Sequence, residues 1–170
     1  MITVLLNSVY ESMAWLAGIF VGGPPKGCCR KLGFQEAEYL ECHDLGEFNV
    51  GSLVFVSSDC LITKEHLHDV MRRVMLRHPL LRMRVTRYGG ELYWQQMDDV
   101  TPDVRVQETN DWNAVLEDTM LETYNTENGP LWRVTLLPDV TSEYNDADFK
   151  FHAALVFGFC HCVIDGQGEY

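Results

Sequence analysis

The sequence predicts a mixed α/β fold with a sheet at its centre and helices flanking it. Strand patterns and helix patterns alternate along the chain, which is typical of this fold class. The long apolar run at residues 149–160 is typical of a central strand that is covered on both faces. Apolar residues make up 46% of the 170 residues and charged residues 22%, which indicates a folded domain with a hydrophobic core.

Strands are predicted where β-branched and aromatic residues gather. These segments are residues 48–57, 82–87, 91–97, the short 104–107, 131–137 and 149–160. Gly89 and Gly90 predict a hairpin turn between the second and third of these segments.

Two helices are predicted between the strands. Thr63 is a suitable N-cap for a helix that runs to about His78, where Pro79 ends it, and Asp111 is a suitable N-cap for a second helix. The spacing of apolar residues predicts a buried stripe on each helix. The stripes are Leu67, Val70, Met71 and Val74 on the first helix, and Trp112, Val115, Leu116, Met120 and Leu121 on the second.

A Gly- and Pro-rich break at residues 21–27 divides the chain into a leader of uncertain structure, residues 1–29, and a folded domain, residues 30–170. Residues 1–20 are fairly apolar but carry polar interruptions, so we expect an amphipathic helix or a poorly defined leader. Membrane association through residues 1–20 is the alternative, because Lys26, Arg30 and Lys31 follow them.

The net charge indicates which partners the protein can bind, and the cysteines indicate the redox state of its compartment. With 13 basic and 25 acidic residues, the formal net charge of -12 repels phosphate backbones, so we expect no nucleic-acid partner. None of the 6 cysteines forms a Cys-x-x-Cys pair, and a chain of this length needs no disulfide scaffold. We therefore expect free thiols in a reducing compartment and a cytoplasmic protein.

The central strand runs directly into His161, which makes this histidine a candidate general base. The strand fixes the backbone, and an imidazole is the side chain best suited to take and return a proton near neutral pH. Asp165 is suited to hold the following turn, and Gly166 lets a substrate or a neighbouring backbone approach closely.

Other interpretations of this segment stay open. A buried histidine that bonds a backbone carbonyl is a common outcome. Cys160, His161 and Cys162 also suggest a metal site completed by Cys28, Cys29 or His43, or a Cys162 nucleophile beside His161. On a strand, however, Cys160 and Cys162 face one side and His161 the other, so we expect no metal site and no direct Cys162–His161 pair.

Four segments, in order along the chain, resemble one family. Residues 160–166 (CHCVIDG) resemble the H-H-x-x-x-D-G motif shared by chloramphenicol acetyltransferase, alcohol acetyltransferases, wax ester synthases and the condensation domains of peptide synthetases. Residues 77–82 (RHPLLR) and 128–133 (NGPLWR) resemble further segments of condensation domains, and residues 30–36 resemble the opening of alcohol acetyltransferases. The resemblance implies the N-terminal half of a chloramphenicol acetyltransferase-like fold.

The resemblance also implies roles for individual residues. His161 matches the general base, which takes the proton of an alcohol, or less readily an amine, as it attacks an acyl thioester. Asp165 and Gly166 match the motif aspartate and glycine, and Arg82 matches the arginine that pairs with the aspartate. The family binds no permanent cofactor. Its co-substrate is an acyl-CoA or a carrier-protein thioester.

The sequence departs from the family pattern at two places. Cys160 replaces the first motif histidine, which favours the alcohol acetyltransferase branch over condensation domains. The second half of the family fold has no counterpart here, so we expect the isolated chain to be inactive without that half. The alternatives are an amide-forming, condensation-type enzyme and a non-catalytic interaction module.

Overall fold

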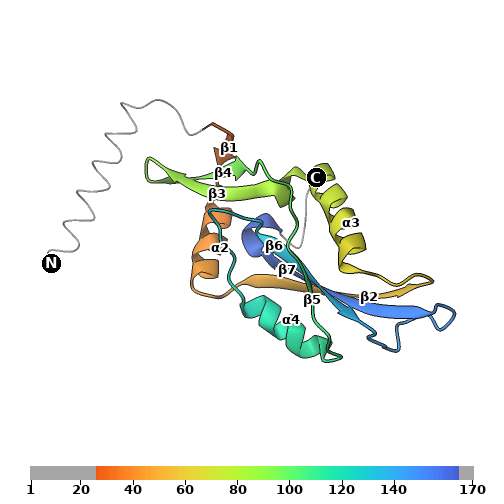
Figure 1. The fold of residues 1–170 in the computed structure, drawn as a ribbon. Coiled ribbons are helices and arrows are strands. Elements are labelled where there is room, and N and C mark those ends of the chain that lie inside the picture. The colour runs from red at the N-terminus through yellow and green to blue at the C-terminus, as the bar shows by residue number, and fades with distance from the viewer. Residues whose placement is uncertain (1–25, 165–170) are drawn as a thin grey trace.

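The computed structural model describes residues 26–164, which form two sheets and three α-helices (Figure 1). The leader before residue 26, the proposed membrane-binding residues 1–20, and both Asp165 and Gly166 lie outside the described residues. In chain order the elements are β1 (Cys28–Lys31), α2 (Phe34–Asp44), β2 (Asn49–Ser58), α3 (Lys64–Arg77), the 3₁₀ turn η1 (Pro79–Arg82), β3 (Met83–Tyr88), β4 (Glu91–Gln96), β5 (Val104–Val106), α4 (Trp112–Leu121), β6 (Trp132–Pro138), β7 (Phe151–Cys160) and the 3₁₀ turn η2 (His161–Val163).

The larger sheet has the strand order β2-β7-β6-β5, so the strand predicted to be central does lie inside the sheet. It pairs antiparallel with β2 on one side and with β6 on the other, while β5 runs parallel to β6. No residue of β7 is exposed, which confirms that both of its faces are covered. The other predicted strands also form, with small differences at their ends.

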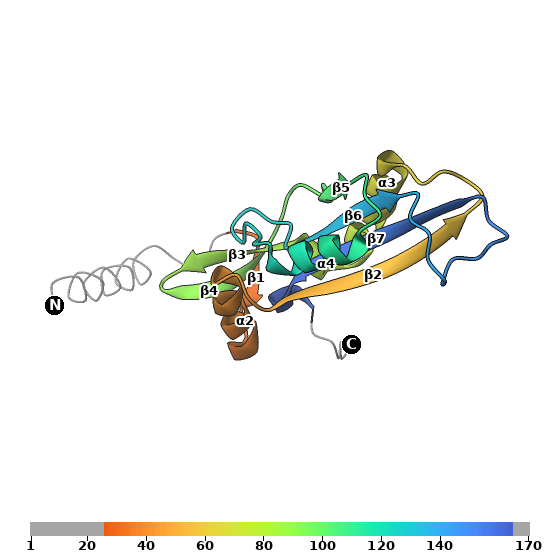
Figure 2. The ribbon, with the colours of Figure 1, turned by 90° about the horizontal axis from the view of Figure 1, so that it is seen from below.

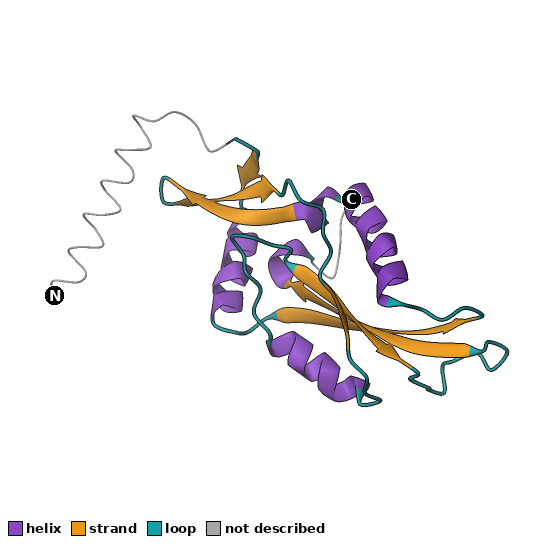
Figure 3. Cartoon of the chain, in the orientation of Figure 1, coloured by secondary structure: helices purple, strands orange, loops and turns teal. Residues whose placement is uncertain are grey.

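Helices α3 and α4 cover opposite faces of this sheet (Figures 2 and 3). Alternation along a strand sends successive side chains to opposite faces. Ala153 therefore packs with Leu67 and Met71 of α3, whereas Ala154 packs with Val115 of α4. The mixed α/β fold with flanking helices is thus confirmed.

The smaller sheet has the order β1-β4-β3 and lies at the end of the molecule where α2 also lies (Figures 1 and 2). Its hairpin turns at Gly89 and Gly90, which adopt positive φ angles of 59° and 83°, as the predicted turn requires. Val85 and Trp94 from this sheet pack into the same apolar cluster as Cys160 and Cys162. The two sheets therefore share a core at the end of β7.

Two elements, β1 and α2, have no counterpart in the sequence prediction. Helix α2 lacks a clear apolar stripe, because Phe34 is 84% exposed and only Leu40 and His43 are buried. Gly33 has no side chain to cap the helix, and the Glu36 carboxylate instead accepts the Gly33 N–H at 2.6 Å. The helix depends on tertiary contacts, which the local pattern does not show.

The predicted helix stripes were partly wrong. Val70 on α3 is 52% exposed, and Met120 and Leu121 at the end of α4 are exposed as well. A wide apolar stripe predicted from spacing alone includes flanking positions that the neighbouring sheet does not reach. Within residues 26–164, no helix is long and apolar enough to cross a bilayer.

A buried charged side chain joins α4 to β6. Arg133 leaves only 8% of its side chain exposed, and its Nε lies 3.1 Å from the Asp103 carboxylate. Its Nη1 contacts the Glu122 carboxylate just after α4, and its guanidinium lies 4.8 Å from the centre of the Tyr124 ring. Burying a guanidinium is tolerated because it has these partners.

Two cross-strand glycines, Gly51 and Gly158, make room for α4 on the sheet. A Cβ at Gly158 would overlap Thr119 Cγ2 and lie 2.5 Å from the Tyr124 hydroxyl oxygen. A Cβ at Gly51 would lie 2.8 Å from the flexible ends of Leu116 and Met120, which can move aside. The sheet thus needs a glycine at position 158 more strictly than at position 51.

We predict that Gly158→Ala lowers the free energy of unfolding by about 2–3 kcal/mol through overpacking against Thr119 and Tyr124. Gly51→Ala is the matched control, since both changes restrict the unfolded backbone equally. Urea unfolding followed by far-UV circular dichroism measures both. A loss for Gly158→Ala no larger than that for Gly51→Ala would contradict the packing argument.

Candidate active site

His161 directly follows β7 and opens the turn η2, with a half-buried side chain. Its ring stacks on Tyr39 of α2, with ring centroids 4.2 Å apart and an interplanar angle of 22°. Phe48, from the connection between α2 and β2, lies at 6.0 Å and is tilted by 32°. The Tyr39 and Phe48 rings also lie 6.1 Å from each other, so the imidazole forms a cluster with two aromatic rings from a part of the chain more than a hundred residues away.

Phe48 has an unusual backbone conformation that serves this arrangement. Its φ is 65°, in the left-handed region that residues other than glycine rarely adopt. Phe48 as a whole residue is nevertheless 57% exposed, so burial does not account for that conformation. A strained residue beside a half-buried histidine is typical of a functional site.

The two ring nitrogens of His161 are in different surroundings. Nδ1 is buried and has no hydrogen-bond partner among residues 26–164. A buried polar atom normally has a hydrogen-bond partner. Because the described part of the chain offers none to Nδ1, a complete site would have to supply a hydrogen-bond partner for this nitrogen.

Helix α2 is held in place by His43, the one buried histidine, whose role sequence reasoning missed. Asn49 Nδ2 donates to the carbonyls of Met120 at 3.1 Å and Glu122 at 2.7 Å. The Asn49 Oδ1 therefore faces His43 Nδ1 at 2.8 Å and accepts a hydrogen bond from that nitrogen. The other nitrogen, Nε2, accepts the Tyr124 N–H at 2.9 Å.

Burial alone would lower the pKa of His43, but its hydrogen bonds with Cys160, Asn49 and Tyr124 raise that pKa to about 9. This network also joins α2 to β2, to the end of α4 and to the segment before β6. Tyr39 and His43 are spaced i and i+4, so both lie on the same face of α2. Fixing His43 therefore fixes the face of α2 that presents Tyr39 to His161.

Arg82 ends the turn η1, and its Nε is buried without a hydrogen-bond partner in the described range 26–164. The turn is anchored to the larger sheet because the Leu81 carbonyl accepts the Trp132 Nε1–H at 2.9 Å. Asp165, the partner that the resemblance implies for Arg82, lies outside the described residues, as does Gly166.

Cys160 and Cys162 lie side by side, with their Sγ atoms 3.1 Å apart, while His161 points to Tyr39. The two cysteines thus share one side and His161 takes the other, as predicted, although the turn η2 and not a continuing strand produces this arrangement. Residues 26–164 contain no group of three or more ligating side chains suited to a metal ion.

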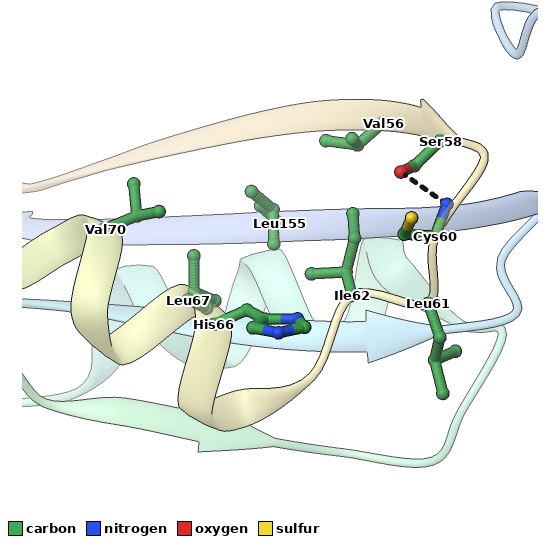
Figure 4. Close-up of a pocket in the computed structure, with 9 residues that line it drawn as sticks. All are labelled: Val56, Ser58, Cys60, Leu61, Ile62, His66, Leu67, Val70 and Leu155. Carbon is green, nitrogen blue, oxygen red and sulfur yellow. Dashed lines mark hydrogen bonds between the residues drawn. The ribbon is translucent and has the colours of Figure 1, made fainter.

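A separate apolar cavity of about 340 Å³ lies between α3 and the strands β2 and β7 (Figure 4). Ile62, Leu67 and Leu155 line it, and Cys60 and His66 contribute polar atoms. Leu155 lies in the middle of β7, whereas His161 follows the end of that strand. The cavity is therefore separate from the space around His161.

Comparison with solved structures identifies the fold. The chain superposes on the four-domain nonribosomal peptide synthetase AB3403, bound to AMP and glycine, with a TM-score of 0.62 and 14% identity over 85% of this chain and 11% of that one. It superposes on the X-domain from teicoplanin biosynthesis with a TM-score of 0.61 and 14% identity, over 84% of this chain and 29% of that one.

A third match is a starter condensation domain of the rhizomide synthetase RzmA in complex with C8-CoA. The TM-score is 0.58 and the identity 12%, over 78% of this chain and 31% of that one. No family model matches the sequence, and a comparison with curated protein sequences gives no match.

The chain thus has the fold of condensation domains, which confirms the chloramphenicol acetyltransferase-like half-domain that the resemblance predicted. It spans 29–34% of the length of the separately solved condensation domains and the X-domain that it matches. This coverage agrees with a half-domain.

We predict that Asn49→Asp lowers the free energy of unfolding by about 2–4 kcal/mol, because the carboxylate cannot donate to the Met120 and Glu122 carbonyls. Asn113→Asp, at an exposed position near the start of α4, is the control and should change stability by less than about 0.5 kcal/mol. Chemical unfolding measures both variants. Equal losses would show that the Asn49 network does not hold α2.

Proposed function

We propose that this chain is the histidine-bearing half of an acyltransferase that moves an acyl group from an acyl thioester, such as acyl-CoA, to an alcohol. The observation that carries the proposal is a half-buried His161, clamped by Tyr39 at the end of the central strand of a condensation-domain fold. One relative with this fold is solved in complex with C8-CoA, which supports a thioester donor.

In this proposal His161 is the general base. Because Nδ1 is buried, Nε2 is the nitrogen suited to meet the substrate, and it is free to accept a proton when Nδ1 carries the ring proton. The alcohol loses its proton to His161 as its oxygen attacks the thioester carbonyl. The carbon–sulfur bond then breaks, an ester forms, and His161 returns the proton to the leaving thiolate.

Tyr39 and Phe48 act as positioning residues. Their rings restrict the plane of the imidazole, so that its nitrogen keeps one direction towards the acceptor. Arg82 supports the site by pairing with Asp165, a role consistent with its buried and unpartnered Nε within residues 26–164.

The proposal also requires the second half of the domain. This chain spans about a third of the condensation domains that it matches. A thioester and an acceptor must be held together and shielded from water for acyl transfer to outcompete hydrolysis. We therefore expect the isolated chain to show little or no transfer.

Amide formation is the second candidate function. It is favoured by the solved structures, which are condensation domains and a nonribosomal peptide synthetase. Amine and alcohol acceptors need the same proton transfer to His161, so the acceptor distinguishes the two reactions.

We predict that His161→Ala lowers acyl transfer by a factor of about 10² or more. The assay uses the chain together with the second half of the fold that the proposal requires, with acetyl-CoA and C8-CoA as donors and alcohols or amines as acceptors. His66→Ala, an exposed histidine on α3, is the matched control. Equal rates for His161→Ala and the parent, or no transfer by the parent, would sink the proposal.

We predict a smaller loss at Tyr39. Removing the stacked ring in Tyr39→Ala should reduce kcat by roughly threefold to tenfold, the equivalent of one aromatic contact. Tyr39→Phe keeps the ring and should lose less than Tyr39→Ala. Steady-state kinetics measure both variants, and an identical loss in the two would assign the effect to the hydroxyl instead of the stacking.

A further inference from the structure

The two cysteines on either side of His161 form a close pair in the core. Their Sγ atoms lie 3.1 Å apart, about 1 Å beyond the length of a disulfide bond. Cys160 is fully buried and Cys162 is 4% exposed. Their neighbours in the core cluster include the apolar Leu40 and Val163. Each thiol is a hydrogen-bond partner of the other, and the buried imidazole of His43 also interacts with Cys160.

The contact makes the two thiols chemically unequal. The hydrogen bond from the Cys162 thiol lowers the pKa of Cys160, and the same interaction raises the pKa of Cys162. A thiolate, not a thiol, attacks a disulfide in exchange reactions. Cys160 is thus suited to react first and Cys162 to resolve the intermediate.

We infer that Cys160 and Cys162 are a reversible oxidation site, which forms an intramolecular disulfide around His161 when a small disulfide such as oxidised glutathione is the oxidant. The Cys160 thiolate attacks one glutathione sulfur and releases one glutathione thiolate. Cys162 then attacks the Cys160 sulfur in the mixed disulfide and releases the second. Two cysteine thiols are oxidised, oxidised glutathione is reduced to two thiols, and the two protons leave with them.

The local structure allows the oxidant to reach a pair that is buried in the folded state. Cys162 lies in η2, a single 3₁₀ turn of three residues that follows the end of β7. Such short turns have weak hydrogen bonding and open at a lower free energy than the whole domain. Cys160 itself ends a strand that is paired on both sides, so the turn is the part that moves.

The remaining four cysteines lack this arrangement. Cys28 and Cys29 are adjacent in the chain, but among residues 26–164 no hydrogen bond joins the sulfur atoms of Cys28, Cys29, Cys42 or Cys60 to one another. Replacing the four by serine leaves a chain in which any intramolecular disulfide must join Cys160 to Cys162.

The experiment equilibrates this four-serine variant with a series of glutathione and oxidised glutathione mixtures, traps free thiols by alkylation in acid, and measures the intact mass. We expect a species that has lost the mass of two hydrogens and carries no glutathione. The equilibrium constant for forming the Cys160–Cys162 disulfide from the dithiol and oxidised glutathione should be at least about tenfold higher in the folded chain than in the urea-unfolded chain. Circular dichroism verifies the fold in each sample.

A further Cys162→Ser change in the same background is the control, and we expect it to yield no intramolecular disulfide. An equilibrium constant in the folded chain equal to or below that in urea, or a mixed glutathione adduct as the only product, would overturn the inference. The wild-type chain, digested after alkylation and mapped by mass spectrometry, gives the same readout if the serine variant does not fold. Neither measurement depends on the proposed acyl transfer.

Discussion

The hydrogen bonds around Asn49 hold together the elements on which the candidate site depends. Carbonyls of Met120, at the end of α4, and of Glu122 fix the amide of Asn49, and the amide oxygen is hydrogen-bonded to Nδ1 of His43. Because His43 lies one turn after Tyr39 on α2, this helix cannot rotate without breaking a buried hydrogen bond. The orientation of the His161 ring, which stacks on Tyr39, therefore depends on the hydrogen bond between His43 and Asn49 one helical turn away.

Packing on the α4 face of the sheet supports that contact. Gly158 lets Tyr124 and Thr119 approach β7 closely, which brings the Tyr124 backbone to the Nε2 of His43. Arg133, the cross-strand partner of Gly158, lies under the Tyr124 ring and pairs with carboxylates beside α4. A single glycine and a single buried arginine thus connect the core of the larger sheet to the position of α2. The same residues on the α4 face of the sheet thus pack the core and position helix α2.

The sequence could predict those parts of the fold that arise from local patterns. The central strand, the hairpin at Gly89 and the caps at Thr63 and Asp111 each depend on residues within one turn or strand, and all are present. Helix α2 depends on contacts with Asn49 of β2, with Tyr124 and with the turn η2, so its own residues show no strong pattern. The same limit applies to the site. His161 was predicted as a candidate from its place after the strand, whereas its partner Tyr39 could be found only once α2 had been placed in space.

Cys160 gives the site a chemistry that differs from the motif it resembles. The resemblance places a histidine at this position, and here a buried imidazole near the Cys160 sulfur comes instead from His43 on α2. His43 interacts with Cys160 as well as with Asn49 and Tyr124, and the Sγ of Cys162 lies 3.1 Å from the Sγ of Cys160. A histidine at position 160 would not form a disulfide, whereas Cys160 lies close enough to Cys162 to do so. Replacing one buried residue has therefore placed a redox-active pair on both sides of the residue proposed to carry the proton.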